Sequence, residues 1–246
     1  MKALAAIAAT LALCPAAFAG IELRCEVPPS LTEPQALLPR VAVSVKRAQK
    51  LDIVVLSGAP SQMGAGDGPR SYPAFLEAEL KERLPNVEIH VTVQTAPRRT
   101  AFEVLPTLPK LLAETKPTLV IWQSGTVEAY RGIDADGYGR KLQVGVGTLL
   151  DGGADVLLVN MQYSPRTDAL VDAAAYTEMM RTVAFTKDVP FFNRYRIMRE
   201  WSENGAFDLA ALHIGRKEYE EIHRCVGSLM ADFVIRAATL GANASR

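Results

Sequence analysis

Histidine is scarce in this 246-residue chain, which contains only three, at positions 90, 213 and 223. These positions are far apart, and none of them forms the closely spaced ligand pairs that are typical of zinc sites. We therefore expect no metal site. The GAGDG segment at 64–68 also lacks the G-x-G-x-x-G spacing of a dinucleotide-binding loop. The sequence accordingly predicts no cofactor.

The chain lacks an excess of either charge, since 27 lysines and arginines are balanced by 27 aspartates and glutamates. Such a balance gives no support for a nucleic-acid partner or for binding to an anionic membrane surface. Beyond the N-terminal region, no apolar stretch is long enough to cross a bilayer as a helix. We therefore expect no transmembrane segment in the mature chain.

The N-terminal region has the pattern of a secretory signal peptide. Lys2 supplies the positive charge, residues 3–13 form a short apolar run, and Ala17-Phe18-Ala19 fits a small-x-small cleavage site. The apolar run is too short to span a membrane. We expect cleavage after Ala19, and the sequence therefore predicts an exported protein that is periplasmic or secreted.

Cysteine is as rare as histidine, and one of the three cysteines, Cys14, lies in the predicted signal peptide. The mature chain then contains Cys25 and Cys225. Two cysteines in an oxidising compartment are more often paired than free, so we expect a disulfide; the alternative is two thiols that never meet. The bridge would join an N-terminal arm to the last helix and, from loop-closure entropy, would stabilise the fold by up to about 5 kcal/mol.

Apolar strand-like runs alternate with helical periodicity from residue 51 onward. Strands are predicted at 51–57, 87–93, 118–123, 155–161 and 189–192. Helices are predicted at 35–49, 71–84, 100–114, 139–150, 168–185, 195–201 and 217–238, with prolines at 39, 106 and 109 interrupting two of them. Strands that are apolar at every position are typical of a parallel sheet covered on both faces, whereas the alternating strand at 87–93 is predicted to lie at an edge.

This pattern predicts a single-domain, three-layer α/β/α sandwich with a mainly parallel five-stranded sheet. The expected organisation is a signal peptide at 1–19, an arm and helix at 20–50, the domain at 51–239 and a flexible tail at 240–246. Binding chemistry in such a fold collects at the carboxyl ends of the strands. Four of these ends are polar or contain glycine, as expected for a pocket rim: 57–61, 94–99, 123–128 and 161–165.

Several segments resemble sequence blocks of the SGNH/GDSL hydrolase superfamily of esterases and acetyl hydrolases. They are LDIVVLSG with the GAG that follows it, SYPAFLEAELKERLPNVEIHV, TLVIWQSGT and DVLLVNMQYSP. The likeness covers residues 51–233 and implies the flavodoxin-like fold of the superfamily. In that superfamily a serine after the first strand attacks an ester carbonyl, and a late D-x-x-H supplies the base and its orienting aspartate. The serine's own amide, a glycine and an asparagine form the oxyanion hole.

The nucleophile block departs from the superfamily pattern. Gly58-Ala59-Pro60 stands where the superfamily has Gly-Asp-Ser, so that Pro60, which has neither a hydroxyl nor an N–H, occupies the nucleophile position. Ser61 replaces that nucleophile only if the turn shifts its register. Ser57 is the weaker candidate for the same role.

The other three blocks depart as well. No glycine is present at 94–99, and Val127 stands in place of the asparagine that donates to the oxyanion. In the last block, Ala210-Ala211-Leu212-His213 matches D-x-L-H only at its leucine and histidine, so Ala210 replaces the orienting aspartate. Asp208 lies two residues earlier and is the candidate substitute.

These four departures together predict a pseudo-hydrolase: an exported protein that keeps the hydrolase fold, lacks catalysis and binds a small ligand or an envelope glycan. The predicted pocket residues are Gly58, Arg98, Arg99, Gly125 and Glu128. Arg98 and Arg99 are candidates for binding an anionic group, and the alternative is that both are solvated.

Two enzymatic alternatives remain open. The first is an active serine esterase or acetyl hydrolase with Ser61 as nucleophile, His213 as base and Asp208 as the orienting carboxylate. The second is a different chemistry built from carboxylates such as Glu128 and Asp155, although a lone glutamate on a loop is usually solvated.

Overall fold

The computed structural model describes residues 24–58 and 68–243, and the statements below concern these residues. Pro60 and Ser61, the two residues on which the predicted nucleophile block depends, lie outside the described residues. Among the helices that are described, none is long and apolar enough to cross a membrane.

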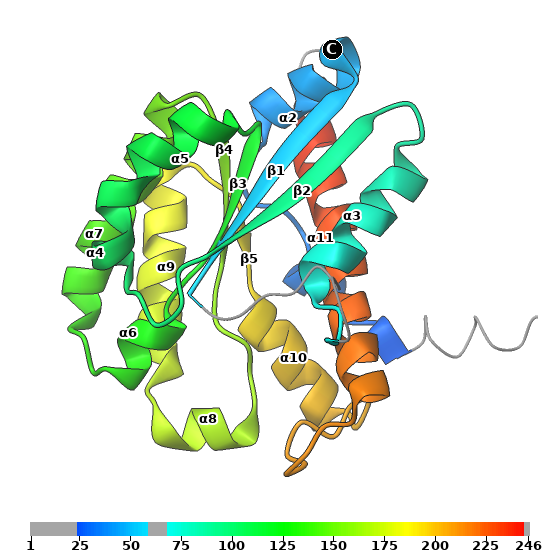
Figure 1. Ribbon diagram of the computed structural model, residues 1–246. Helices are drawn as coiled ribbons and strands as arrows, with labels where there is room; N and C mark the ends of the chain where they lie inside the picture. Colours follow the sequence, from blue (N-terminus) through cyan, green and yellow to red (C-terminus); the bar gives the residue numbers. More distant parts are fainter. Residues whose placement is uncertain (1–23, 59–67, 244–246) are drawn as a thin grey trace, which may run out of the picture.

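A five-stranded sheet forms the middle layer of the protein (Figure 1). Its strands are β1 (Lys50–Ser57), β2 (Glu88–Thr95), β3 (Leu119–Gln123), β4 (Asp155–Val159) and β5 (Phe191–Phe192). The spatial order is β2-β1-β3-β4-β5, and all four neighbouring pairs are parallel. The predicted fold class is therefore confirmed, and β2 lies at an edge as its alternating sequence indicated.

Helices cover both faces of the sheet. Their bounds are η1 (Pro29–Leu31), α2 (Pro39–Val43), η2 (Ser44–Ala48), α3 (Tyr72–Arg83), α4 (Ala101–Val104), η3 (Leu105–Thr107), α5 (Leu108–Thr115), α6 (Thr126–Tyr130), α7 (Ala135–Asp151), α8 (Pro165–Leu170), α9 (Ala173–Lys187), α10 (Arg194–Glu203) and α11 (Arg216–Asn243). Figure 1 shows α2, α3 and α11 on one side of the sheet and α4, α5, α7 and α9 on the other. Residues of α10 belong to the same apolar core as those of α3 and α11.

The alternation of side chains along each strand divides the interior into two apolar cores. In β1, Leu51, Ile53 and Val55 join the core under α3 and α11, whereas Val54 and Leu56 join the core under α4, α5, α7 and α9. Every residue of β3 and β4 is buried, since helices lie on both of their faces. Burial on both faces is why these two strands are nearly continuous apolar runs.

Proline and an aspartate cap account for the helices whose limits were predicted wrongly. The first helix begins at Pro39 instead of being interrupted there, because proline suits the first turn of a helix. The single helix predicted at 168–185 is two helices, α8 and α9. Val171 between them is extended (φ −135°, ψ 145°), and the carboxylate of Asp172 accepts the N–H of Ala175 (3.2 Å) to begin α9.

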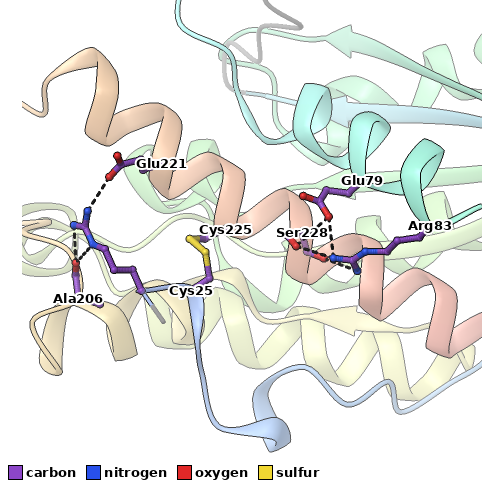
Figure 2. The surroundings of a disulfide bond; sticks show 8 residues. Cys25, Glu79, Arg83, Ala206, Glu221, Cys225 and Ser228 are labelled. Carbon is purple, nitrogen blue, oxygen red and sulfur yellow. Dashed lines mark hydrogen bonds and ion pairs between the residues drawn. A yellow bond between two sulfur atoms is a disulfide. The ribbon is translucent and has the colours of Figure 1, made fainter. Parts of the chain in front are cut away.

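A disulfide joins the N-terminal arm to α11, as predicted (Figure 2). Cys25 and Cys225 are 200 residues apart in sequence, and their Cα atoms lie 5.0 Å apart. Beside the bridge, Nη1 of Arg24 donates to Oε2 of Glu221 (2.7 Å), and Nη2 donates to the carbonyl of Ala206 (2.8 Å). The arm is therefore fixed to the domain by a covalent bond and by a charged hydrogen bond.

Candidate functional site

The carboxyl ends of the parallel strands meet at one edge of the sheet. Ser57 at the end of β1 lies opposite Thr95 of β2 and Gln123 of β3. Helices α6, α8 and α10 follow β3, β4 and β5 and lie at this same edge, toward the bottom of Figure 1. We call this edge, with the segments that follow each strand, the carboxyl edge. The described segments of the predicted pocket rim lie together at this edge.

Backbone hydrogen bonds fasten the segment after β2 to the end of β1. The N–H of Ala96 donates to the carbonyl of Ser57 (2.9 Å), and the N–H of Arg98 donates to the carbonyl of Gly58 (3.1 Å). The carbonyl of Arg98 in turn accepts from Nη2 of Arg131 (2.6 Å). Arg98 and Arg99 are both exposed. Arg98 thus takes part in this contact through its backbone, and its guanidinium faces solvent.

A cavity of about 40 Å³ lies at the carboxyl edge between the ends of β1 and β3. A space of this size holds a few water molecules at most or one small substituent of a ligand. Its walls include Gly58, Arg99, Gly125, Val127 and Glu128, all of which the sequence had singled out. Arg98, the remaining predicted pocket residue, is not among the walls of this cavity.

The backbone conformation favours glycine at position 125, and close neighbours leave little room for a side chain at position 58. Gly125 has φ 99°, a left-handed conformation that residues with a side chain rarely adopt. A Cβ atom at Gly58 would lie 3.2 Å from the carbonyl oxygen of Arg99 and 3.3 Å from Cγ2 of Val127. Val127, which the resemblance aligns with an oxyanion donor, therefore presents a methyl group to the end of β1.

Glu128 is buried, with 2% of its surface exposed, in contrast to the solvated loop residue that the sequence suggested. It lies on the short helix α6, which the sequence did not predict. Its Oε1 accepts the N–H of Ala101 at the start of α4 (2.6 Å), and its Oε2 accepts the N–H of Gly125 (3.1 Å). Burial raises the pKa of this carboxyl, and these two hydrogen bonds oppose the rise. Glu128 thus joins the beginnings of two helices.

Asp155 is the first residue of β4 and lies at the amino end of the strands, whereas Glu128 lies at the carboxyl edge. Its Oδ2 accepts the N–H of Val41 (2.9 Å), and its Oδ1 pairs with Nη1 of Arg40 (3.5 Å). The two carboxylates proposed for a different chemistry therefore do not form one site. Each of them instead accepts hydrogen bonds from a backbone segment.

His213 and Asp208 both lie in the connection between α10 and α11, and both are exposed. Oδ1 of Asp208 accepts the N–H of Ala210 (3.1 Å), which closes a turn within the connection itself. Within the described residues, His213 has no hydrogen bond or ion pair. The structure thus places the candidate base and carboxylate in one connection without joining them.

The other two histidines lie outside the cavity. His223 on α11 is 6% exposed, and its Nδ1 accepts the N–H of Tyr72 (3.0 Å). Burial, with a smaller effect from the Arg194 charge, lowers the pKa of His223 to about 2. His90 lies on the edge strand β2 beside Glu88, with 2.9 Å between Nε2 and Oε1, at the amino end of that strand. In the described part of the chain, no histidine pairs with a carboxylate at the carboxyl edge.

Arg194, the first residue of α10, is a buried cation that the sequence did not draw attention to. Nη1 donates to Oε1 of Gln123 at the end of β3 (3.2 Å), and Nη2 donates to Oε1 of Gln162 after β4 (3.0 Å). Its carbon Cζ lies 5.3 Å from the centre of the Tyr72 ring. The one sequence signal for this residue is its place directly after a strand, at the carboxyl edge.

A wider hollow of about 450 Å³ lies between the N-terminal arm, the end of α9 and Asn193 after β5. Its walls include Leu31, Arg181, Phe185 and Asp188. None of the predicted site residues is among them.

Comparison with protein families matches residues 24–240 to the Non-GDSL lipase-like family. The chain belongs to this family. The match confirms the resemblance to SGNH/GDSL-type hydrolases that the sequence blocks carried. The family description also agrees with the absence of a Gly-Asp-Ser-Leu sequence after β1, where this chain has Gly58-Ala59-Pro60-Ser61.

Several solved structures share the fold of this Non-GDSL lipase-like protein. TesA is 20% identical over 74% of this chain and 98% of its own, with a TM-score of 0.55. A catalytic mutant of Axe2, an acetylxylan esterase from Geobacillus stearothermophilus, is 13% identical over 75% of this chain and 94% of its own, with a TM-score of 0.60. LAE5, an α/β hydrolase enzyme from the metagenome of Lake Arreo in Spain, is 18% identical over 77% of this chain and 94% of its own, with a TM-score of 0.56. At these identities the likeness shows the fold alone. A comparison with curated proteins gives no match.

Proposed function

We propose that this Non-GDSL lipase-like protein is an exported pseudo-hydrolase that binds a small molecule or an envelope glycan at its carboxyl edge without hydrolysing it. The observation that carries the proposal is the position of the histidines. All three lie among the described residues: His213 is exposed and unpaired there, His223 is buried and neutral, and His90 lies at the far end of the edge strand. A serine nucleophile requires a base within hydrogen-bonding reach.

The oxyanion hole supports the same proposal. Val127 lines the cavity at the position where the superfamily has an asparagine, and its side chain carries no donor. Loss of one oxyanion donor commonly lowers the catalytic rate constant by a factor of about 10²–10³. The segment after β2 supplies no glycine; Arg99 of this segment lines the cavity and Arg98 does not. The cavity therefore suits binding of a small substituent better than stabilisation of an oxyanion.

Export is supported by two independent features. The N-terminal sequence has the pattern of a signal peptide, and the Cys25–Cys225 bridge is a kind of bond that persists in oxidising compartments. Since Axe2 is an acetylxylan esterase, acetylated oligosaccharides are the first ligands to test.

Two hydrogen bonds favour the alternative of an active esterase. Oε1 of Glu220 accepts the N–H of Arg70 (3.1 Å), and Nη2 of Arg216 donates to the carbonyl of Gly68 (3.4 Å). These bonds join the beginning of α11, just after His213, to residues shortly after Ser61. The alternative keeps Ser61 as nucleophile, His213 as base and Asp208 as the orienting carboxylate.

Hydrolysis of p-nitrophenyl acetate distinguishes the two functions. We expect the mature protein and its Ser61→Ala and His213→Ala variants to hydrolyse the ester at the same rate as buffer with an unrelated protein. Turnover that is lost in both variants and kept in a Ser164→Ala control would establish the esterase. Calorimetry with acetylated xylo-oligosaccharides then tests binding, and Gly58→Val, which adds a side chain to the cavity wall beside Arg99 and Val127, is expected to weaken it.

A further inference from the structure

The guanidinium of Arg194 is a buried charge without a counter-ion. The residue is 2% exposed, and no carboxylate in the described ranges 24–58 and 68–243 pairs with it. Its two terminal nitrogens donate to the neutral amides of Gln123 and Gln162, and Nε has no partner among the described residues. Buried charges in proteins are nearly always paired with an opposite charge. Among the described residues, the positive charge of Arg194 is therefore not balanced by a negative charge.

Among the described residues, none that surrounds Arg194 supplies a negative charge. The Tyr72 ring lies under the guanidinium, and its buried hydroxyl has no hydrogen-bond partner in the part of the chain that the structure describes. His223 stacks on Tyr72 with the ring planes 8° apart and the centroids 6.3 Å apart, and it is neutral. Tyr219 lies on the other side of His223, with 4.2 Å between the ring centroids. The cluster therefore carries a net positive charge and two unpartnered donor groups, Arg194 Nε and the Tyr72 hydroxyl.

The location of Arg194 is that of a ligand-binding residue in this fold. It lies two residues after the end of β5, whereas Gln123 ends β3 and Gln162 follows β4, so that all three lie at the carboxyl edge. The N-terminus of the ten-residue helix α10 adds the positive end of a helix dipole at the same point. Ser57, which lies opposite Gln123 in the register, is the neighbouring position on β1.

Gln162 is the outer partner of the guanidinium. Gln162 is exposed, whereas Gln123 and Arg194 are buried, so Gln162 is the partner on the solvent side of the guanidinium. A rotation of the Gln162 side chain removes a neutral oxygen from Nη2 and requires no movement of the backbone. An anion that took this place would gain a charge-assisted bond, which is stronger than the amide bond it replaces.

We propose that Arg194 binds the carboxylate of the ligand, which displaces the amide oxygen of Gln162 and accepts hydrogen bonds from Nε and Nη2. The planar carboxylate matches the edge of a guanidinium in a bidentate arrangement, and the Tyr72 hydroxyl is a further donor. The inference rests on the proposed function, because it specifies the ligand class of the same carboxyl edge: a carboxylated small molecule or a glycan that contains an acidic sugar.

Titration with glucuronate tests this site, with glucose as the neutral analogue and sulfate as a non-planar anion. The measurement is calorimetry on the mature protein, together with the NMR signal of the Arg194 Nε–H group. Gln162→Glu places a carboxylate of the chain itself beside Nη2, and since Gln162 is exposed this variant leaves the core unchanged. Gln94→Glu adds the same charge at another position of the carboxyl edge and is the matched control.

We expect glucuronate to bind, to shift the Nε–H signal and to bind Gln162→Glu at least about tenfold more weakly than the wild type, with Gln94→Glu within about twofold. Glucose and sulfate are expected to bind more weakly than glucuronate. The site is disproved by an absence of glucuronate binding, by equal binding to Gln162→Glu, or by an unmoved Nε–H signal. Equal binding of sulfate would disprove the preference for a carboxylate. Ester hydrolysis through Ser61 would overturn the pseudo-hydrolase proposal and leave this binding result unaffected.

Discussion

The backbone N–H of Tyr72 donates to Nδ1 of His223 over 3.0 Å, and this bond joins the start of α3 to α11. A ring nitrogen that accepts a hydrogen bond carries no proton, so His223 is neutral with its proton on Nε2. Burial and the Arg194 charge lower its pKa to about 2, far below the ordinary value of 6.5. The contact between the two helices therefore depends on an imidazole that stays neutral.

Acid is expected to destabilise the protein through His223. The unfolded chain takes up a proton below about pH 6.5 that the folded protein refuses until about pH 2, so this contribution to stability is complete above pH 6.5 and falls with pH. One proton corresponds to about 1.4 kcal/mol per pH unit. Urea unfolding between pH 7 and pH 4 is expected to show this additional slope in the wild type and not in His223→Asn. The exposed His213→Asn variant is the control, and an equal slope in all three proteins would contradict the account.

Removal of the Glu128 carboxylate is expected to destabilise the carboxyl edge. Glu128→Ala leaves the buried N–H groups of Ala101 and Gly125 without acceptors, at a cost of about 2–4 kcal/mol, and Glu128→Gln is expected to cost less because it keeps one acceptor. The measurement is the free energy of unfolding in urea. Glu103→Ala is the matched control, because Glu103 caps the same helix from an exposed position. Equal losses for Glu103→Ala and Glu128→Ala would show that burial of the carboxylate has no effect.

Replacement of Gly125 by alanine is expected to cost about 1–2 kcal/mol, because a Cβ atom disfavours its φ of 99°. Gly147→Ala is the comparison, since Gly147 lies within the helix α7, where alanine is favoured over glycine. Thermal melting of the two variants is expected to move in opposite directions. A Gly125→Ala variant as stable as the wild type would remove the backbone explanation for this glycine.

Loss of the disulfide is expected to lower the free energy of unfolding by about 2–5 kcal/mol, because the bridge closes a loop of 200 residues. The Cys25→Ser/Cys225→Ser double variant and the reduced wild type are expected to unfold at the same, lower urea concentration. In the double variant, amide hydrogens of the arm are expected to exchange faster than those of β3. If reduction of the disulfide leaves the urea midpoint of unfolding unchanged, the arm is held by Arg24 and its partners alone.

The fold could be predicted from local periodicity because its strands and helices bury regular apolar faces. The all-apolar strands at 119–123 and 155–159 indicated a sheet covered on both faces, and the alternating strand β2 indicated an edge. Proline was harder to interpret: Pro106 and Pro109 divide a helical stretch as expected, whereas Pro39 begins a helix.

The side-chain chemistry of the carboxyl edge could be predicted only in part. Gly58, Gly125 and Glu128 were predicted as pocket residues from their position after a strand. The hydrogen bond that Glu128 accepts from the N–H of Ala101 could not be predicted, because Ala101 is 27 residues away. Arg194 was missed because its partners, Gln123 and Gln162, are 71 and 32 residues distant, and a glutamine after a strand has no distinctive local pattern. Only the tertiary structure brings these groups together.

The most direct test of the central claim is reaction of the mature protein with a fluorophosphonate probe, followed by intact-mass measurement. An active serine hydrolase in the same tube serves as the positive control. The account predicts that the protein remains unmodified while the control is fully labelled. A single stoichiometric adduct on the wild type that is absent from Ser61→Ala would contradict it.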